Sequence, residues 1–230
     1  MKAVRVHELG GPEVLTYEEV SDPVPQPGEA LVRIKAAGVN YLDIYYRSGF
    51  HWGGHHGRAL PYIPGAEAAG IVAATGSNTT GLSVGDCVAY GISNGFGAYA
   101  ELHAVPIRHL YKFPASVDFE SAAAVMLQGM TAHYLTHSTY QVKQSDTVLV
   151  HAAAGGTGLL LVQLAKMRGA RVFGTVSSDE KAEVVKQAGA DATINYSQRD
   201  FAAEVRTLTA GVGVNVVYDS VGKATYEKSL

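Results

Sequence analysis

The sequence is poor in several features that mark particular classes of protein. It holds a single cysteine, Cys87, which excludes an internal disulfide framework and a zinc site built from several cysteines. No run of about 18 consecutive apolar residues occurs, so a membrane-spanning helix is not expected. The first residues lack the continuous apolar run of a signal peptide. Together with the lone thiol, which suits a reducing compartment, these absences predict a cytosolic protein.

A strong charge of either sign is also lacking. The net charge of −3 and the isoelectric point near 6.3 give no electrostatic reason to expect nucleic acid as a partner. The sequence is instead 47% hydrophobic, which is enough for a substantial core. Its 26 glycines indicate many tight turns or close approaches of the backbone.

The two halves of the chain follow different patterns. Up to about residue 116, short strand-like stretches are separated by glycine and proline, which is typical of a barrel-like or sandwich-like β domain. After Pro114, a long helix is expected at 118–140, and strands expected at 147–151, 171–176, 192–196 and 214–219 then alternate with helices. Such alternation predicts βαβ units and a parallel sheet. We therefore expect an α/β protein with domains at 1–117 and 118–230.

The alternation stops at Leu230, shortly after the fourth of these strands. That strand, around residues 214–218, would form an exposed apolar edge, and such edges favour unwanted association. We expect either a fragment or shortened version of a longer protein, or a second chain that covers the edge.

A glycine-rich turn stands between the strand at 147–151 and the helix that follows it. Its register is Ala153-x-Gly155-x-x-Gly158, which is the dinucleotide fingerprint with alanine in place of the first glycine. Gly155 would let the backbone approach a pyrophosphate, and Gly158 would let the helix pack closely on the sheet. The free amides at the helix start, around Gly156 and Thr157, would receive the phosphate charge. Tight turns between strands and helices also use glycine for purely structural reasons.

The end of the next strand favours one dinucleotide over the other. NAD-selective folds place an acidic residue there to hold the ribose 2′-hydroxyl. Here Ser177, Ser178 and Lys181 follow the strand, and hydroxyls with an ammonium group suit a 2′-phosphate. Asp179 and Glu180 weaken this argument, although their position fits the start of the next helix better. We therefore expect NADPH.

Taken together, several stretches resemble the quinone oxidoreductase, or zeta-crystallin, family within the zinc-alcohol-dehydrogenase-like, medium-chain reductase superfamily. The longest is the signature at 145–166, SDTVLVHAAAGGTGLLLVQLAK. Shorter ones are GGPEVL at 10–15, VNYLD at 39–43, RSG at 47–49, PGAEAAG at 64–70, GMT at 129–131 and VYDSVG at 217–222. The resemblance implies a GroES-like barrel followed by a Rossmann domain that is incomplete here, and it also implies a homodimer.

The resemblance further bears on zinc. The zinc-dependent relatives use a cysteine near position 40 and a histidine before Glu67, whereas this chain has Asn40 and Ala66 there. Without those ligands, Lewis-acid catalysis by zinc is not expected. The substrate should then accept hydride without a metal, as quinones and conjugated enones do.

The same resemblance implies roles for residues on the N-terminal side. Tyr45 would lie near the nicotinamide and substrate, where its phenol could donate a hydrogen bond or a proton to the carbonyl being reduced. The alternative is a half-buried ring with a satisfied hydroxyl. Asn40 and Asp43 would orient the nicotinamide and its ribose, unless Asp43 only caps the short helix that precedes Arg47.

Four further residues are candidates for cofactor contacts. Thr131 and Tyr134, one turn apart on a long helix, could face the phosphates, or could simply pack within the protein. Tyr196 would pack on the adenosine, and ordinary burial at a strand end is the alternative. Ser220 follows the fourth strand at the carboxyl edge, where open α/β sheets bind ligands, or it belongs to a plain turn.

Histidines at positions 51, 55 and 56 form a cluster that could suggest a metal, but their glycine-flanked positions offer little preorganisation. We predict a mobile loop at the rim of a substrate pocket and no metal site. The sequence thus predicts an NADPH-dependent, metal-free reductase of quinones. The alternatives are an enone or 2-alkenal reductase of the same superfamily and a non-catalytic NADPH-binding protein, crystallin-like or RNA-associated.

Overall fold

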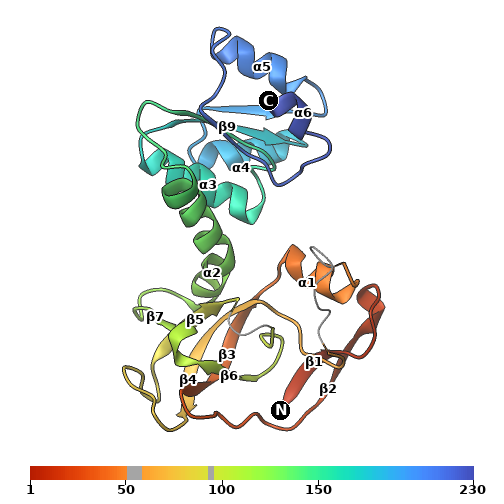
Figure 1. Ribbon diagram of the computed structural model, residues 1–230, viewed down its shortest axis with the longest axis vertical. Helices are drawn as coiled ribbons and strands as arrows, with labels where there is room; N and C mark the ends of the chain where they lie inside the picture. Colours follow the sequence, from red (N-terminus) through yellow and green to blue (C-terminus); the bar gives the residue numbers. More distant parts are fainter. Residues whose placement is uncertain (51–58, 93–95) are drawn as a thin grey trace. The chain divides into compact units, whose positions relative to one another are not determined.

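The computed structural model describes residues 1–50, 59–92 and 96–230. The chain divides into two compact units, Met1–Leu127 and Gln128–Leu230, called here the N-terminal and C-terminal units. The border lies inside helix α2 (Phe119–Tyr134), which runs from one unit into the other (Figure 1). The expected domain ranges of 1–117 and 118–230 stay a prediction.

The N-terminal unit is built on antiparallel strands. Its main sheet has five strands in the order β6-β3-β4-β5-β7, and β1 pairs separately with β2. The strands are β1 (Lys2–Val6), β2 (Leu15–Glu19), β3 (Glu29–Gly38), β4 (Glu67–Thr75), β5 (Cys87–Gly91), β6 (Leu102–Pro106) and β7 (Tyr111–Lys112). Helix α1 (Tyr41–Arg47) and the 3-10 turns η1 (Pro12–Val14) and η3 (Ile107–His109) complete the unit. The predicted β domain is therefore present.

Strand β4 is buried on both faces, which explains its run of small residues. One face, with Ala68 and Val72, joins the apolar core of the sheet. The other face, with Ala69, packs against Ala122 and Ala123 of α2. Alanines allow this close approach of helix and strand, and they place the start of α2 beside the first residues of β4.

The C-terminal unit contains a parallel sheet with the strand order β10-β9-β8-β11. Its strands are β8 (Thr147–Val150), β9 (Arg171–Val176), β10 (Ala192–Asn195) and β11 (Val216–Tyr218). The helices are α3 (Gly156–Met167), α4 (Asp179–Gln187), α5 (Phe201–Leu208) and α6 (Tyr226–Ser229). The predicted parallel sheet and its alternation with helices are confirmed.

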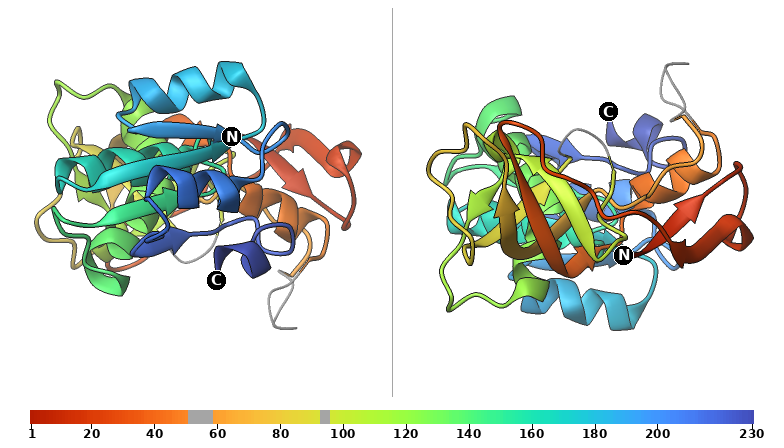
Figure 2. Two further views of the ribbon diagram at one scale, coloured as in Figure 1. Left: turned by 90° about the horizontal axis from the view of Figure 1, so that it is seen from above. Right: turned by 90° about the horizontal axis from the view of Figure 1, so that it is seen from below.

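Both faces of this sheet carry helices. Val148 and Val150 of β8 lie in one core cluster with residues of α3 and α4. Leu149, between them in the sequence, lies in a second cluster with Phe201 and Val205 of α5; α5 lies over the near face of the sheet in the left view of Figure 2. Full burial of such a side chain contributes about 1.5–3 kcal/mol, and burial on both faces explains the unbroken apolar run of β8.

Two details differ from the sequence-based expectation. The long helix predicted at 118–140 remains α-helical only to Tyr134 and continues as a π-helical turn, η4 (Leu135–Thr139). In η4, Thr136 is fully buried and its hydroxyl donates to the carbonyl of Ala132 at 2.8 Å. The fourth parallel strand, β11, is shorter than expected, and it is an edge strand as predicted, because β8 is the only strand of residues 1–50, 59–92 and 96–230 that pairs with it.

Candidate functional site

The turn at 151–155 joins β8 to α3 and is held by neighbouring strands on both sides. The amide of His151 donates to the carbonyl of Tyr218 at 2.9 Å, and that of Ala153 donates to Thr175 at 3.1 Å. Ala152 adopts the left-handed conformation, with φ of 49°. Gly155 is the N-cap of α3. The predicted succession of strand, glycine turn and helix is confirmed.

An added side chain would meet different obstacles at the three glycines of the turn. A Cβ on Gly158 would lie 2.5 Å from the carbonyl oxygen of Ala152 and 2.8 Å from Cα of Ala153, so close packing of α3 requires glycine there. A Cβ on Gly156 would collide with the side chain of Gln128. Gly155 differs, because its φ is an ordinary −74° and a Cβ there would meet only the Ala152 oxygen, at 3.2 Å.

A Cβ on Gly155 would therefore make one tight contact, which a small shift of the Ala152 carbonyl could relieve, whereas the contacts at Gly158 with the backbone are closer. Gly155 and Gly156 are also exposed. The amides of the first turn of a helix have no acceptor within that helix and carry partial positive charge. When such amides are accessible from solvent, they can donate hydrogen bonds to a phosphate group.

The end of β9 brings two of the predicted cofactor residues into contact. The ammonium Nζ of Lys181 donates to the hydroxyl of Ser177 at 3.1 Å. Ser178 is the N-cap of α4, and its hydroxyl oxygen accepts a hydrogen bond from the backbone amide of Lys181 at 3.4 Å. The exposed ammonium and the half-buried Ser177 hydroxyl thus form a cationic, hydrogen-bonding end to the strand.

The two acidic residues beside this strand end are engaged locally. Asp179 Oδ1 accepts the side-chain amide of Asn195 at 2.9 Å. The hydroxyl of Ser178 lowers the pKa of the exposed Glu180 carboxyl by hydrogen bonding. Both residues begin α4, where negative charge is favourable.

Tyr196 lies next to the end of β9. Its amide donates to the carbonyl of Val176 at 3.0 Å, and its side chain is half exposed. The following residue, Ser197, donates its hydroxyl to the carbonyl of Ser177 at 3.1 Å. Tyr196 and Ser177 therefore belong to one neighbourhood.

The remaining predicted residues of this unit are spread over two other elements. Thr131 is half-buried and Tyr134 half exposed on α2. Ser220 is exposed in a turn organised by Asp219, whose Oδ1 accepts the amides of Val221 at 2.8 Å and Gly222 at 3.0 Å. No direct bond joins Ser220 to the pair of Ser177 and Lys181 among the described residues.

Sequence reasoning missed His151, which directly follows β8. Its ring is almost fully buried, with Nδ1 2.9 Å from the hydroxyl of Thr175 and Nε2 3.1 Å from that of Ser229. Burial lowers the pKa of the imidazole, and the carboxylate of Asp219 opposes that shift. A polar residue at the end of an apolar strand was the available signal.

In the N-terminal unit, Asn40 and Asp43 belong to a buried polar network that also contains two residues not predicted. Asn40 donates its backbone amide to Asp43 Oδ2 at 2.9 Å and its side-chain amide to Glu67 Oε1 at 2.8 Å. The hydroxyl of Tyr99 donates to Asp43 Oδ2 at 2.8 Å. Glu67 Oε2 also accepts the amide of Leu127 in α2 at 2.6 Å.

Burial shifts the pKa values of the carboxyl and phenol groups in this network. Burial raises the pKa of Glu67, against the hydrogen bonds from Asn40 and Leu127, and nearby Asp43 raises it further. Burial also raises the pKa of Asp43, although the bonds from Asn40 and Tyr99 oppose it. The phenol of Tyr99 has a raised pKa, because it is buried and donates to a carboxylate.

Asp43 thus performs the capping role that was the alternative to a cofactor contact, since its carboxylate reaches back to the amide of Asn40 at the start of α1. A carboxylate in a strand otherwise made of alanine, glycine and other apolar residues was the available signal for Glu67. Tyr99 joins the network across 56 positions of sequence, so no local pattern could reveal it.

Tyr45 lies on α1 within a group of aromatic rings. Its ring centroid is 5.5 Å from that of Tyr41 and 5.2 Å from that of Phe50. The side chain is half-buried. These ring contacts orient the side chain of Tyr45. Its role as a donor to the substrate stays a prediction.

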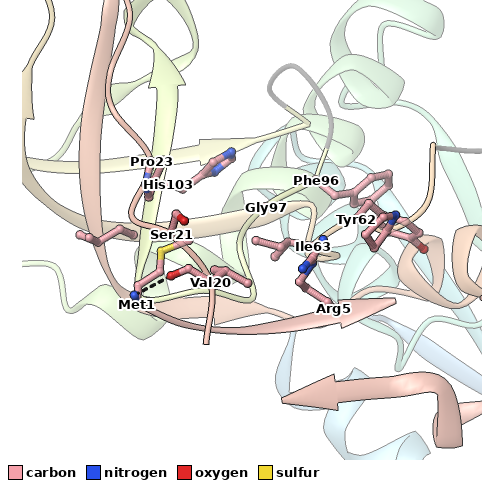
Figure 3. A pocket seen from close by; sticks show the side chains of 12 residues that line it. Met1, Arg5, Val20, Ser21, Pro23, Tyr62, Ile63, Phe96, Gly97 and His103 are labelled. Carbon is pink, nitrogen blue, oxygen red and sulfur yellow. Dashed lines mark hydrogen bonds between the residues drawn. The ribbon is translucent and has the colours of Figure 1, made fainter. Parts of the chain in front are cut away.

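A separate cavity of about 540 Å³ lies in the N-terminal unit. Arg5, Tyr62, Phe96 and His103 are among the residues that line it (Figure 3). Its charged groups are paired inside the protein, because Arg5 binds Glu18 at 2.9 Å and the N-terminal ammonium binds Asp22 at 2.7 Å. None of the predicted site residues lines this cavity.

The described residues contain no group of three or more His, Cys, Asp or Glu side chains that could hold a metal ion. Histidines 51, 55 and 56, for which a mobile loop was predicted, lie outside the described residues. In residues 1–50, 59–92 and 96–230, no helix is both long and apolar enough to cross a membrane.

Comparison with known families gives two matches. Residues 26–115 match the alcohol dehydrogenase GroES-like domain, and residues 156–230 match the zinc-binding dehydrogenase family. These matches confirm the predicted GroES-like and Rossmann domains.

Individual relatives cover the whole chain. A quinone oxidoreductase of Pseudomonas aeruginosa is 47% identical over 100% of this chain and 69% of its own length. A 2-haloacrylate reductase of a Burkholderia species is 45% identical over 99% of this chain and 68% of its own. The crystal structure of Escherichia coli quinone oxidoreductase complexed with NADPH has a TM-score of 0.93 and 41% identity, over 100% of this chain and 69% of that one. The chain belongs to the quinone oxidoreductase family of the medium-chain dehydrogenase/reductase superfamily.

Proposed function

We propose that this chain reduces quinones with NADPH and without a metal ion. Family membership supports the reaction class, and the exposed glycine turn before α3 and the contact of Lys181 with Ser177 support a dinucleotide site in one unit. NADPH, when bound, supplies the hydride. The chain's own residues hold the dinucleotide, orient the substrate and deliver the proton that the reduced oxygen takes up.

The observation that carries the proposal is the pair of exposed glycines, Gly155 and Gly156, at the start of α3. An added Cβ on Gly155 would make a single tight contact, with the Ala152 oxygen, so the packing of the fold explains this glycine less fully than Gly158, and a group that approaches from outside would explain the rest. In our proposal the pyrophosphate lies against Gly155 and Gly156 and accepts hydrogen bonds from the first amides of α3, at Thr157 and Gly158.

The 2′-phosphate is proposed to lie at Ser177 and Lys181. Their existing contact of 3.1 Å already brings an ammonium and a hydroxyl together, and both groups donate to phosphate oxygens. Ser178 contributes by fixing the start of α4, which carries Lys181. Tyr196, half exposed beside this strand end, would cover the adenosine.

Three residues outside this strand end are proposed as further cofactor contacts. Thr131 and Tyr134 would reach the phosphates from α2. Ser220 would act from the turn after β11, at the carboxyl edge of the sheet where β8 and β9 also end.

On the substrate side, Tyr45 is the proposed hydrogen-bond and proton donor to the carbonyl oxygen being reduced. Asn40 and Asp43 support this role as positioning residues, because they fix the beginning of α1, the helix that carries Tyr45. Asn40 in turn is held by Glu67.

The 2-haloacrylate reductase among the relatives favours a second candidate, reduction of a conjugated alkene. An enone or 2-alkenal would accept hydride at carbon and a proton at the neighbouring carbon or oxygen, which needs the same cofactor turn and a donor such as Tyr45. A non-catalytic NADPH-binding role is the alternative from another class. We further propose a homodimer in the cytosol, the latter because Cys87 is the single cysteine.

The test compares NADPH oxidation by the full chain with 1,4-benzoquinone, 9,10-phenanthrenequinone, a 2-alkenal and 2-chloroacrylate. We expect the quinones to be reduced fastest. Tyr45→Phe should lower turnover by on the order of a hundredfold while NADPH binding is kept. Tyr41→Phe, an exposed neighbour on the same helix, is the matched control.

Reduction of the alkenes alone would replace the quinone proposal by the second candidate. NADPH binding without turnover of any of the four compounds would support the non-catalytic role. Light scattering in the same buffer tests the dimer, which a monomeric mass would refute.

A further inference from the structure

Two histidines lie one helical turn apart where α2 passes into the π-helical turn η4. His133 is in the last turn of α2 and His137 is inside η4. Their imidazole rings are stacked, with centroids 4.1 Å apart and planes inclined by 11°. The spacing of four residues puts both side chains on one face, which is the arrangement that lets two histidines of a helix share a metal ion.

The hydrogen bonds around His137 fix which ring nitrogen carries the proton. Nδ1 lies 3.0 Å from the backbone carbonyl oxygen of His133, which can only accept. Nδ1 is also 2.9 Å from the hydroxyl of Thr136, whose own hydrogen is donated to the carbonyl of Ala132 at 2.8 Å. Both partners of Nδ1 are therefore acceptors, so Nδ1 is the protonated nitrogen and Nε2 carries the lone pair.

This is the bonding pattern of a metal-ligating imidazole. Histidine ligands donate their second ring N–H to a backbone carbonyl or carboxylate, which fixes the tautomer and the ring direction. Thr136 is fully buried, so its hydroxyl is a rigid partner for His137.

His133 supplies the second nitrogen. Its side chain is exposed, and its ring has no hydrogen-bond partner among the described residues. Rotation about its Cβ–Cγ bond can therefore aim a ring nitrogen at the point that Nε2 of His137 faces. The carbonyl end of α2 also favours a cation by its dipole.

We propose that His133 and His137 form a two-imidazole site for a divalent transition-metal cation. No group of three or more candidate ligands occurs in the described part of the chain, so the two nitrogens leave the other coordination positions to water. Imidazole prefers borderline cations, and Cu²⁺ binds more tightly than Ni²⁺ or Zn²⁺ at such a site. A cation bound there would fasten η4 to the end of α2.

The test titrates the full chain with Cu²⁺ and follows binding by calorimetry and by the electron paramagnetic resonance signal of the bound ion. We expect one site whose signal shows two nitrogen ligands. His133→Gln and His137→Gln should each weaken it at least about tenfold, since each removes one ligand of a chelate. The double variant should be little worse than either single one.

Two control variants separate this site from other histidines. His109→Gln, and His55→Gln combined with His56→Gln, should leave the Cu²⁺ affinity unchanged. Circular dichroism and NADPH binding report whether the His133 and His137 variants remain folded. Unchanged affinity in these two variants, dependence on only one of them, or loss of binding in either control would overturn the proposal.

Discussion

The two units differ in whether the polar groups of their candidate sites are bonded within the protein or exposed to solvent. In the N-terminal unit, Glu67 and Asp43 are buried, and both oxygens of Glu67 and Oδ2 of Asp43 accept hydrogen bonds from inside the unit, while Asp43 Oδ1 is buried without a partner among the described residues. In the C-terminal unit, the turn before α3 leaves exposed glycines and unpaired helix amides. Hydrogen bonds made within the protein stabilise its fold, whereas exposed amides without an internal acceptor are available to a ligand.

This contrast separates residues that bind from residues that position. Asn40 and Asp43 were expected to orient the nicotinamide and its ribose, which stays a prediction; within the protein, Asp43 accepts the amide of Asn40 at the start of α1 and the Asn40 side chain donates to Glu67. Gly155 was expected to admit a pyrophosphate, and it is exposed at the start of α3, where the packing of the fold gives only one tight contact against a side chain. Substitutions should therefore affect stability in the first region and ligand affinity in the second.

The largest effect is expected from Glu67→Ala. The change removes the carboxylate that accepts the side-chain amide of Asn40 and the backbone amide of Leu127. Loss of each hydrogen bond to this buried carboxyl costs about 1–3 kcal/mol, so the N-terminal unit should lose about 2–6 kcal/mol of unfolding free energy. Urea unfolding measures the loss, and hydrogen exchange at Leu127 should accelerate. Glu120→Ala, at an exposed position of α2, should leave both unchanged; equal effects of the two variants would contradict a stabilising role of the Glu67 hydrogen bonds.

The next largest effect separates two glycines of one turn. Gly158→Ala brings a Cβ to 2.5 Å from a backbone oxygen, so we expect a loss of about 1–3 kcal/mol in stability and a lower melting temperature. Gly155→Ala should cost about 1 kcal/mol or less, the difference between glycine and alanine at an N-cap. It should nevertheless weaken NADPH binding about tenfold or more, because the methyl group occupies the approach of the pyrophosphate.

Calorimetric melting and NADPH titration of both variants give the comparison. If Gly155→Ala bound NADPH as tightly as the unsubstituted protein, the pyrophosphate would have to lie elsewhere.

The sequence predicted the C-terminal region better because its contacts are local. A strand, a glycine turn and a helix follow each other within twenty positions, and Lys181 reaches Ser177 across a single helical turn. The N-terminal network instead joins residues 27 to 60 positions apart, at Asn40, Glu67, Tyr99 and Leu127. No periodic pattern reports such pairings, and His151 was missed because its partners, Thr175 and Ser229, are equally remote.

The two units should also respond differently to acid. Burial lowers the pKa of His151 from 6.5, so the unfolded chain takes up a proton there before the folded one does. The C-terminal unit should therefore lose stability as pH falls below about 6.5, by at most about 1.4 kcal/mol per pH unit for one proton. The raised pKa values of Asp43 and Glu67 act in the other sense, because their contribution is fully present below the ordinary carboxyl pKa and is lost as pH rises through the raised one.

Urea unfolding between pH 7 and 5, followed by hydrogen exchange in each unit, tests this difference. His151→Gln should flatten the acid response of the C-terminal unit, while His109→Gln should not. An unchanged slope in His151→Gln would show that other groups carry the acid response.

The smallest expected effect concerns the choice of dinucleotide. Lys181 is exposed, so its interaction with a 2′-phosphate is screened by water and should contribute about 1 kcal/mol, or about a fivefold change in affinity. Lys181→Ala should therefore raise the dissociation constant of NADPH about fivefold and leave that of NADH unchanged, because only NADPH carries the 2′-phosphate. Lys181→Arg should retain most of the preference, and Lys186→Ala, near the other end of α4, should retain all of it. If Lys181→Ala weakened the binding of NADPH and NADH equally, this lysine would support the fold of the strand end rather than bind the 2′-phosphate. The proposed dinucleotide contacts of the C-terminal unit would then be limited to the turn at Gly155.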